Sequence, residues 1–187
     1  MGTPFEIKAL DETGRHWVDE FIANRWSAET IVVHGSTYHP AELPGFVACI
    51  DRTPIGLITF TFQGENCELV SMDSLRPRLG IGYALLDAVL ATAWRDGSRR
   101  IWLVTTNDNT FALRFYQRYG FKLSALHKDA VKESRKLKPS IPLLGLDDIP
   151  IRDEIEMELW LDEESVKPRF LMDRKDPSAR HPYHGCN

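Results

Sequence analysis

The chain has 187 residues, of which 43% are hydrophobic and 10% aromatic, so it can bury one sizeable core and is not a disordered chain. Its formal net charge of −4 at pH 7 argues against nonspecific nucleic-acid binding, which needs a basic face, and it suits a cationic amine partner. No signal peptide and no run of about 18 apolar residues is evident, so no membrane insertion is expected. Three cysteines without a Cys-x-x-Cys pair favour a reducing, cytoplasmic location.

The N-terminal half of the chain predicts a strand, a helix and then an antiparallel meander. Residues 5–10 alternate as a strand does, and apolar residues at helical spacing predict a helix over 15–25. Residues 26–44 are less regular, with a short apolar run at 31–33. Runs rich in β-forming residues, separated by turn residues, then predict strands at 46–50, 55–62 and 68–73.

The C-terminal half predicts helices that alternate with strands. Apolar residues at helical spacing predict a helix over 80–95, and the mostly apolar run at 100–105 is typical of a strand buried on both faces. A strand, a helix and a strand in this order imply parallel neighbours joined by a right-handed crossover. Two more strands are expected, at 121–126 and 151–161.

Residues 128–150 form a long insertion before the last predicted strand. A connection of this length in a compact domain is either functional or disordered, and Leu143, Leu144, Leu146 and Ile149 favour a packed lid over disorder. The predicted domain spans residues 1–161. The charged remainder, 162–187, is expected to be a tail that is loosely docked or takes part in homodimer contacts.

A short loop with two glycines joins the strand at 68–73 to the helix at 80–95. Gly80 and Gly82 lack a Cβ, so backbone N–H groups there can approach a ligand closely. They open a helix, whose unpaired N–H donors and partial positive charge favour a phosphate or pyrophosphate. The Walker pattern is excluded, because no Gly-Lys-Ser/Thr occurs, and Leu85 stands where a dinucleotide fingerprint needs a small residue.

Two segments carry a resemblance to a known family. The loop reads Arg76-Pro77-Arg78-Leu79-Gly80-Ile81-Gly82, and residues 109–121 read Asn-Thr-Phe-Ala-Leu-Arg-Phe-Tyr-Gln-Arg-Tyr-Gly-Phe. The first resembles the pyrophosphate loop Arg/Gln-x-x-Gly-x-Gly/Ala of the GNAT superfamily of acyl-CoA-dependent N-acetyltransferases, with Pro77 where that family has its basic residue. The second is similar to the family signature Asn-x-x-Ala-x-x-Phe-Tyr-x-x-x-Gly-Phe. By itself it predicts a helix that is capped by a residue of 107–109 and ended by a left-handed Gly120.

The resemblance covers residues 45–161 and implies an α/β fold, a mixed, twisted sheet of about seven strands flanked by helices, with an insertion before the last strand. It implies acetyl-CoA as the cosubstrate and an amine of a small molecule, peptide or protein as the acceptor. The residues that match the family's cofactor site are Met72, Ser74, Arg76, Arg78, Leu79, Gly80, Ile81, Gly82, Tyr83 and Asn109.

Attack of an amine on a thioester needs a deprotonated amine, a polarised carbonyl and a proton for the departing thiolate. An alkylammonium has a pKa near ~10.4, so a base is useful at neutral pH. Glu68 is the candidate base, close to where several family members place a catalytic glutamate, and Glu65 and Asp73 are alternatives. Backbone N–H groups around 72–74 are expected to polarise the carbonyl. Tyr116 matches the family tyrosine near the sulfur and is the candidate proton donor.

Other functions stay open at this point. A GNAT-like domain can bind acyl-CoA as a sensor or scaffold without turnover, and a nucleotide-binding protein would use the glycine loop alone. A metal site is not expected, because His181 and His184 have no carboxylate or cysteine cluster to complete a ligand set. Ser-His-Asp catalysis has no Gly-x-Ser-x-Gly to support it.

Overall fold

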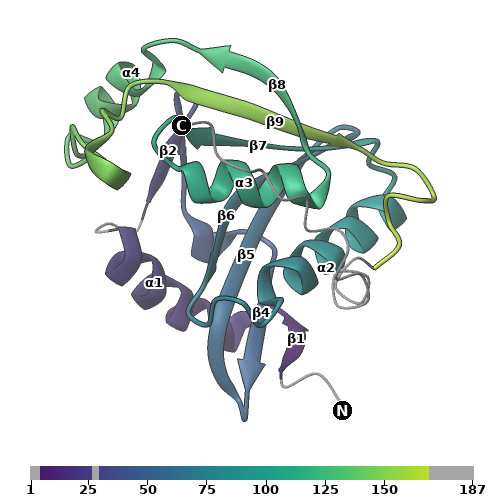
Figure 1. The fold of residues 1–187 in the computed structure, drawn as a ribbon. Coiled ribbons are helices and arrows are strands. Elements are labelled where there is room, and N and C mark those ends of the chain that lie inside the picture. Colours follow the sequence, from purple (N-terminus) through teal and green to yellow (C-terminus); the bar gives the residue numbers. More distant parts are fainter. Residues whose placement is uncertain (1–4, 27–29, 169–187) are drawn as a thin grey trace, which may run out of the picture.

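The computed structural model describes residues 5–26 and 30–168, and its centre is a twisted sheet of seven strands with helices on both faces (Figure 1). The strand number and the α/β class predicted from the sequence are confirmed. The strands of this sheet are β1 (Glu6–Ala9), β4 (Gly45–Ile50), β5 (Thr53–Gln63), β6 (Asn66–Ser74), β7 (Arg100–Thr106), β8 (Lys122–His127) and β9 (Glu154–Trp160).

The spatial order of the strands is β1-β4-β5-β6-β7-β9-β8. Neighbouring strands are antiparallel, except β6 and β7, which are parallel. Helix α2 (Ile81–Arg95) connects these two strands, as the strand–helix–strand pattern predicted. β9 lies between β7 and β8, and the insertion of residues 128–150 belongs to the connection from β8 to β9.

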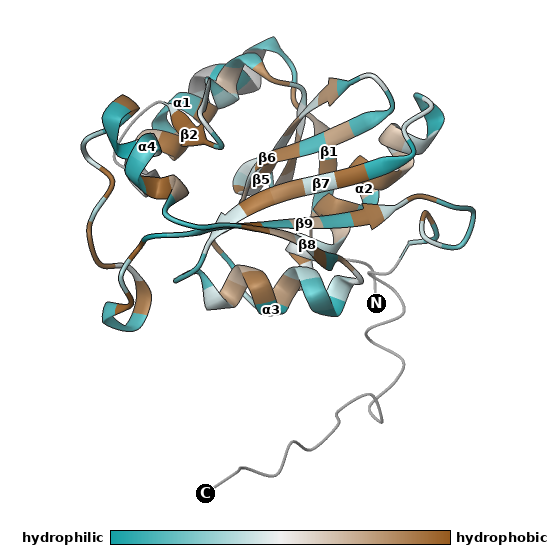
Figure 2. Cartoon of the chain, turned by 90° about the horizontal axis from the view of Figure 1, so that it is seen from above, coloured by the Kyte–Doolittle hydropathy of each residue, from teal (hydrophilic) through white to brown (hydrophobic). Residues whose placement is uncertain are grey.

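The helices divide between the two faces of the sheet. α2 and α3 (Thr110–Tyr119) cover the face on which Ile58 lies, whereas α1 (Glu12–Trp26) packs with Ile22 on the opposite face, against Leu57. Figure 2 shows α3 on one side of the sheet and α1 and α4 on the other. Successive residues of β5 therefore face different layers, as the period of two in a strand requires.

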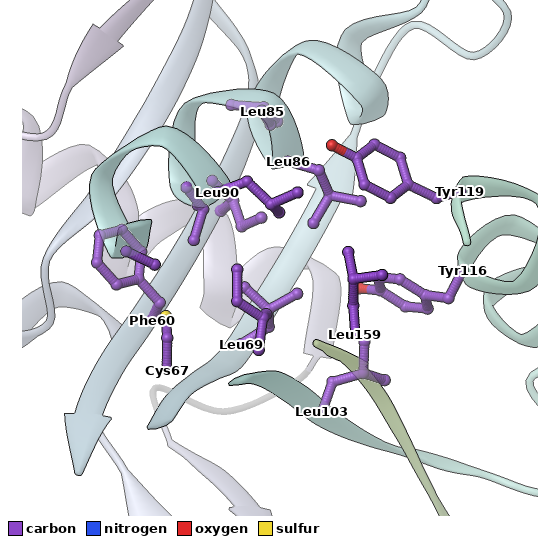
Figure 3. Close-up of a cluster of buried hydrophobic side chains, with 14 of the residues drawn as sticks. Phe60, Cys67, Leu69, Leu85, Leu86, Leu90, Leu103, Tyr116, Tyr119 and Leu159 are labelled. Atoms are coloured by element: carbon purple, nitrogen blue, oxygen red, sulfur yellow. The ribbon is translucent and has the colours of Figure 1, made fainter. Parts of the chain in front are cut away.

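The main core lies between α2, α3 and the sheet. Leu85, Leu86 and Leu90 of α2 are 0–1% exposed and meet Leu69 of β6, while Tyr119 points into the same cluster from α3 (Figure 3). Burial of each such apolar side chain contributes roughly 1.5–3 kcal/mol to folding. This packing fixes α2 and α3 against the parallel strands, where the candidate site is found.

β6 and β7 separate halfway along their length. Their parallel pairing joins residues 66–69 to residues 100–103, whereas the strands continue to Ser74 and Thr106. A bulge at Val70 follows directly after the last pair and bends β6. Figure 1 shows β7, β8 and β9 running in a different direction from β4, β5 and β6. The fold thus opens a gap in the middle of its own sheet.

The irregular region between α1 and β4 contains a hairpin that the sequence did not predict. Its strands β2 (Ile31–Val33) and β3 (Ser36–Tyr38) are antiparallel and form a separate two-stranded sheet. The two turn residues, His34 and Gly35, have φ values of 50° and 73°. Two left-handed residues in a two-residue loop match a type I′ turn, which follows the natural twist of a hairpin.

The insertion is folded, but its leucines do not pack as predicted. It contains α4 (Ala130–Leu137) and a loop over 138–150. Leu143, Leu144 and Leu146 are 73%, 53% and 38% exposed, so the prediction of a lid packed through these side chains is wrong.

Polar contacts hold the insertion in place instead. The Asn107 amide donates to a carbonyl of the insertion at 2.9 Å, and the Asp108 carboxylate accepts from the Leu146 N–H at 3.2 Å. Arg135 of α4 donates to three backbone carbonyl oxygens of the loop and of the residue that follows it. Each such bond contributes about 1 kcal/mol net, and a bond to a charged group about 1.5–3 kcal/mol.

Directly after β9 the Leu161 N–H donates to the Arg99 carbonyl at 2.8 Å, and a turn follows at residues 163–166. The apolar residues 170–172 of the expected tail, Cys186 and the histidine pair at 181 and 184 lie outside the described residues. Within residues 5–26 and 30–168, no helix is long and apolar enough to cross a bilayer. The same part of the chain holds no group of three or more potential metal ligands.

Candidate active site

An open cavity of about 490 Å³ fills the gap between the diverging halves of β6 and β7. Its volume lies in the range of small-molecule sites, roughly 300–1,000 Å³. Residues 69–74 and 103–105 form two of its walls, and the N-cap residue Asn109 and Tyr116 of α3 also line it. The predicted site residues Met72, Ser74 and Gly82 also line it.

A second cavity, of about 550 Å³, lies at the N-terminus of α2. Four arginines line it, Arg76 and Arg78 from the loop and Arg114 and Arg118 from α3. The sequence left open which loop arginine faces a phosphate, and both do line this cavity. Guanidinium groups around a helix N-terminus suit a ligand that carries several negative charges.

The two cavities are neighbours, because Ser74, Gly82, Phe111 and Phe115 line both of them. Phe111 is 71% exposed, so it lies at the rim of the site. Together the cavities can hold an elongated ligand with an anionic end and a less polar arm.

The local geometry favours glycine at two positions of the loop. Gly80 has a φ of 82° and precedes α2 without a side-chain cap. A Cβ on Gly82 would lie 3.0 Å from two ring atoms of Phe115. The ring of Phe115 therefore lies so close to the first turn of α2 that a side chain at position 82 would have to displace it by a few tenths of an ångström.

The other predicted cofactor residues of the loop divide into two groups. Ile81 and Tyr83 line the second cavity, and Tyr83 packs edge-on against Phe115 with ring centroids 5.5 Å apart. Leu79 lines neither cavity and packs against the main core. The role of Leu79 as a cofactor contact stays a prediction.

Tyr116 is 7% exposed and packs between Phe115 and Phe121, at centroid distances of 5.2 and 5.4 Å. Its hydroxyl makes no hydrogen bond to any described residue, and the side chain lines the first cavity. Burial raises the pKa of the phenol far above its ordinary value. The side chain is therefore protonated near neutral pH and can donate a proton to a ligand in the cavity.

The three polar residues before α3 have different tasks. Asn109 is the N-cap, and its side-chain oxygen accepts from the Ala112 N–H at 3.1 Å. Asn107 and Asp108, which the sequence offered as alternative caps, hold the insertion. Asp108 is 6% exposed, and one of its carboxylate oxygens is buried without a partner among the described residues.

Glu68 lies on the sheet face opposite Leu69, so it lines neither cavity but is one residue from the wall of the first. It is 2% exposed, so it is a buried carboxylate and not a solvated one at the edge of the sheet. The Tyr38 hydroxyl donates to Glu68 Oε2 at 2.8 Å. Burial raises the pKa of Glu68, the hydrogen bond from Tyr38 and the charge of His34 lower it, and Glu156 raises it. The net shift is upward, toward the range useful for a base.

Of the two alternative bases, Glu65 occupies a turn, and Asp73 accepts from the Ser74 N–H at 2.6 Å.

The face around Glu68 is rich in charged and aromatic side chains. Trp102 is the neighbour of Glu68 on β7, and the His34 ring lies edge-on to it at 6.5 Å. Glu156 of β9 accepts from Arg100, and His127 lies 3.4 Å from the same carboxylate. Glu68 is therefore surrounded on this face by an indole, two imidazoles, a guanidinium and a second carboxylate.

Sequence reasoning missed Tyr38, His34, Arg114 and Arg118. The two arginines had a signal, because residues four apart lie on one helix face and Phe115, between them, belongs to the matched signature. Tyr38 and His34 had none, because the hairpin that carries them was not predicted.

The fold, the cavity between β6 and β7 and the arginines at the start of α2 together indicate the class of protein. The chain belongs to the acetyltransferase (GNAT) family, whose model matches residues 10–121. Two uncharacterized proteins of Bacillus subtilis (strain 168) are similar to it. YdhI is 39% identical over 146 residues, which cover 78% of this chain and 91% of YdhI. YxbD is 41% identical over 139 residues, which cover 74% of this chain and 87% of YxbD.

The fold is also that of solved acetyltransferases. A GNAT family acetyltransferase from Elizabethkingia anophelis, crystallised with acetyl-CoA bound, superposes with a TM-score of 0.61 at 16% identity. The match covers 86% of this chain and all of the other. At this identity the likeness concerns the fold.

Proposed function

We propose that this protein is an N-acetyltransferase that moves an acetyl group from acetyl-CoA to an amine by direct attack. The observation that carries the proposal is the divergence of β6 and β7 around a cavity lined by Tyr116, next to an arginine-lined cavity at the start of α2. Residues 1–161 are the functional unit. The buried free thiols of Cys49 and Cys67 support a reducing, cytoplasmic setting.

In this proposal the two ends of acetyl-CoA occupy different cavities. Arg76, Arg78 and the N–H groups at the start of α2 bind the phosphates. The pantetheine arm lies along β6 where β7 has turned away. Its amide groups there form hydrogen bonds with the exposed backbone edge of β6, in the place of a neighbouring strand. Backbone N–H groups of residues 72–74 polarise the thioester carbonyl.

The reaction then needs proton transfers at the base, at the leaving group and at the attacking nitrogen. Glu68 takes a proton from the ammonium group through a bridging water, because its side chain lines neither cavity. The amine nitrogen forms a bond to the acetyl carbon, the carbon–sulfur bond breaks, and Tyr116 gives its proton to the thiolate. The attacking nitrogen then loses its surplus proton, which returns through water to Tyr116, and the proton on Glu68 leaves to solvent, so that the next turnover can begin.

The assay is the release of free CoA thiol from acetyl-CoA, measured over a panel of small amines, peptides and proteins, with the acetylated product identified by mass. Glu68→Gln should lower kcat about 10²–10⁴-fold with acetyl-CoA affinity unchanged, as expected for a lost general base. Tight acetyl-CoA binding without acetylation of any amine would instead favour a sensor or scaffold. A thermal shift with nucleotides but not with CoA would contradict both functions.

A further inference from the structure

We propose that Tyr38 is a positioning residue for the Glu68 base: its hydroxyl holds one carboxylate oxygen and leaves the other to the incoming amine or its water. The proposal rests on the proposed function and deepens it. It concerns a hairpin that the family signatures at residues 76–82 and 109–121 do not include.

The first support is the geometry of the contact. The Tyr38 hydroxyl lies 2.8 Å from Glu68 Oε2, and Glu68 Oε1 makes no hydrogen bond to any described residue. The Glu68 side chain is almost fully buried, and a buried carboxylate with one satisfied oxygen still has strong acceptor capacity on the other. A proton of the acceptor amine, or of a water that the amine contacts, satisfies that capacity.

The second support is the way in which the hairpin is held. The His34 backbone N–H, in the turn between β2 and β3, donates to Glu154 Oε2 at 3.1 Å. Before β2, the Thr30 carbonyl accepts from Lys138 Nζ at 2.9 Å. Tyr38 is therefore carried by a segment anchored to β9 and to the residue after α4. A side chain on an anchored hairpin can fix a partner's rotamer, which one on a free loop cannot.

The third support is the direction of the hydrogen bond. Burial and the neighbouring carboxylate raise the pKa of Tyr38 to about 12, so the phenol keeps its proton near neutral pH and is the donor. Three groups face Glu68: Tyr38 from β3 and His34 from the turn favour its ionised form, and Glu156 from β9 opposes it. Two further residues contact Glu156 itself: Arg100, and His127, whose ring packs against that of His34. Without Tyr38 the carboxylate loses its direct donor.

The test is Tyr38→Phe, with the pH dependence of kcat/KM measured on an accepted amine. Catalysis needs ionised Glu68, and loss of the O–H donor disfavours that form, so the acidic limb should move to higher pH. A movement of roughly one pH unit corresponds to a tenfold lower kcat/KM on the acidic side. Tyr119→Phe is the matched control, because it removes a phenol that bonds a different carboxylate, Asp87, at 2.6 Å. Its acidic limb should stay where the wild-type limb is.

A double-mutant cycle shows whether Tyr38 acts through Glu68. In the Glu68→Gln background, Tyr38→Phe should change kcat/KM by less than about twofold, because positioning effects of coupled residues are not additive. An acidic limb that stays in place in folded Tyr38→Phe, or full additivity in the cycle, would overturn the positioning role alone. Absence of turnover in the wild-type protein with every amine would overturn the proposed function. The titration of Glu68 can also be followed without turnover, from its carboxyl 13C resonance, which is assigned with the Glu68→Gln variant. If the titration midpoint of Glu68 is the same in Tyr38→Phe as in wild type, the positioning role of Tyr38 is overturned, whether or not the protein acetylates an amine.

Discussion

Tyr116→Phe is the substitution that best separates chemistry from packing at this site. The change removes one oxygen and leaves the ring, which packs against Phe115 and Phe121. Because the hydroxyl has no hydrogen-bond partner among the described residues, its removal breaks no protein hydrogen bond. The side chain lines an open cavity, so no polar group of the protein is left buried and unsatisfied, and the free energy of unfolding should change by less than about 1 kcal/mol.

The expected effect on turnover is much larger. If the phenol protonates the departing thiolate, kcat should fall roughly 10²-fold, the usual range for a general acid. A CoA thiolate is already a fair leaving group, so solvent can replace part of the effect, and a tenfold fall remains compatible. The loss should appear in kcat and leave acetyl-CoA affinity unchanged, because the interaction forms mainly in the transition state.

Tyr119→Phe provides the opposite pattern as a control. Its hydroxyl donates to Asp87 at 2.6 Å, and hydrogen bonds to charged groups contribute about 1.5–3 kcal/mol, so this variant should be less stable. In a chain of this size that loss lowers Tm by several degrees, at about 2–4 °C per kcal/mol. Its kcat should stay within about threefold of wild type, a small effect next to the roughly 10²-fold expected for a general acid.

The assay is free-thiol release under saturating acetyl-CoA, with calorimetry for affinity and circular dichroism for Tm. A folded Tyr116→Phe protein with wild-type kcat on its accepted amine would reduce Tyr116 to a packing residue. Equal losses of kcat in both variants would show that disturbed packing of α3, and not the missing proton, slows the reaction.

Two further substitutions test other parts of the site. Gly82→Asp adds a Cβ 3.0 Å from the Phe115 ring and a negative charge between the two cavities, so the Kd for acetyl-CoA should rise more than tenfold, at least ~1.4 kcal/mol, by calorimetry. Unchanged affinity in a folded variant would exclude this loop as the phosphate site. Gly145→Ala places a Cβ 1.9 Å from Asp108 Oδ2, so the loop of the insertion should detach, at a cost of about 1–3 kcal/mol, and exchange its amide hydrogens faster. Unchanged exchange over residues 143–150 would show that the contact does not hold the insertion.

The frame of the fold could be predicted because its signals are local. The apolar period of α2, the apolar run of β7 and the turns between β4, β5 and β6 each depend on neighbouring residues. A short strand–helix–strand connection then leaves parallel pairing as the favoured arrangement. The glycine loop could be placed for the same reason, since it lies between a clear strand and a clear helix.

The surroundings of the base could not be predicted, because they depend on distant contacts. Tyr38 reaches Glu68 across 30 positions, from a hairpin whose strands have three residues each. Its turn begins with His34 in a left-handed conformation, which histidine adopts more readily than most residues but which no composition rule selects. Periodicity needs a longer segment than this to separate a strand from a loop.

The insertion was mispredicted for a related reason. Its leucines suggested apolar packing, whereas polar contacts between the insertion and other segments hold it in place. Glu154 of β9 is the clearest case, because it is 2% exposed and accepts from the Ser134 hydroxyl of α4 at 2.9 Å and from the His34 backbone N–H at 3.1 Å. A buried carboxylate without donors is strongly unfavourable, so α4 and the hairpin each stabilise this residue of β9 by supplying a donor to one of its oxygens. The hairpin in turn carries Tyr38 to Glu68. The order around the base thus depends on three segments that meet only in the folded chain, and none of them shows this in its own sequence.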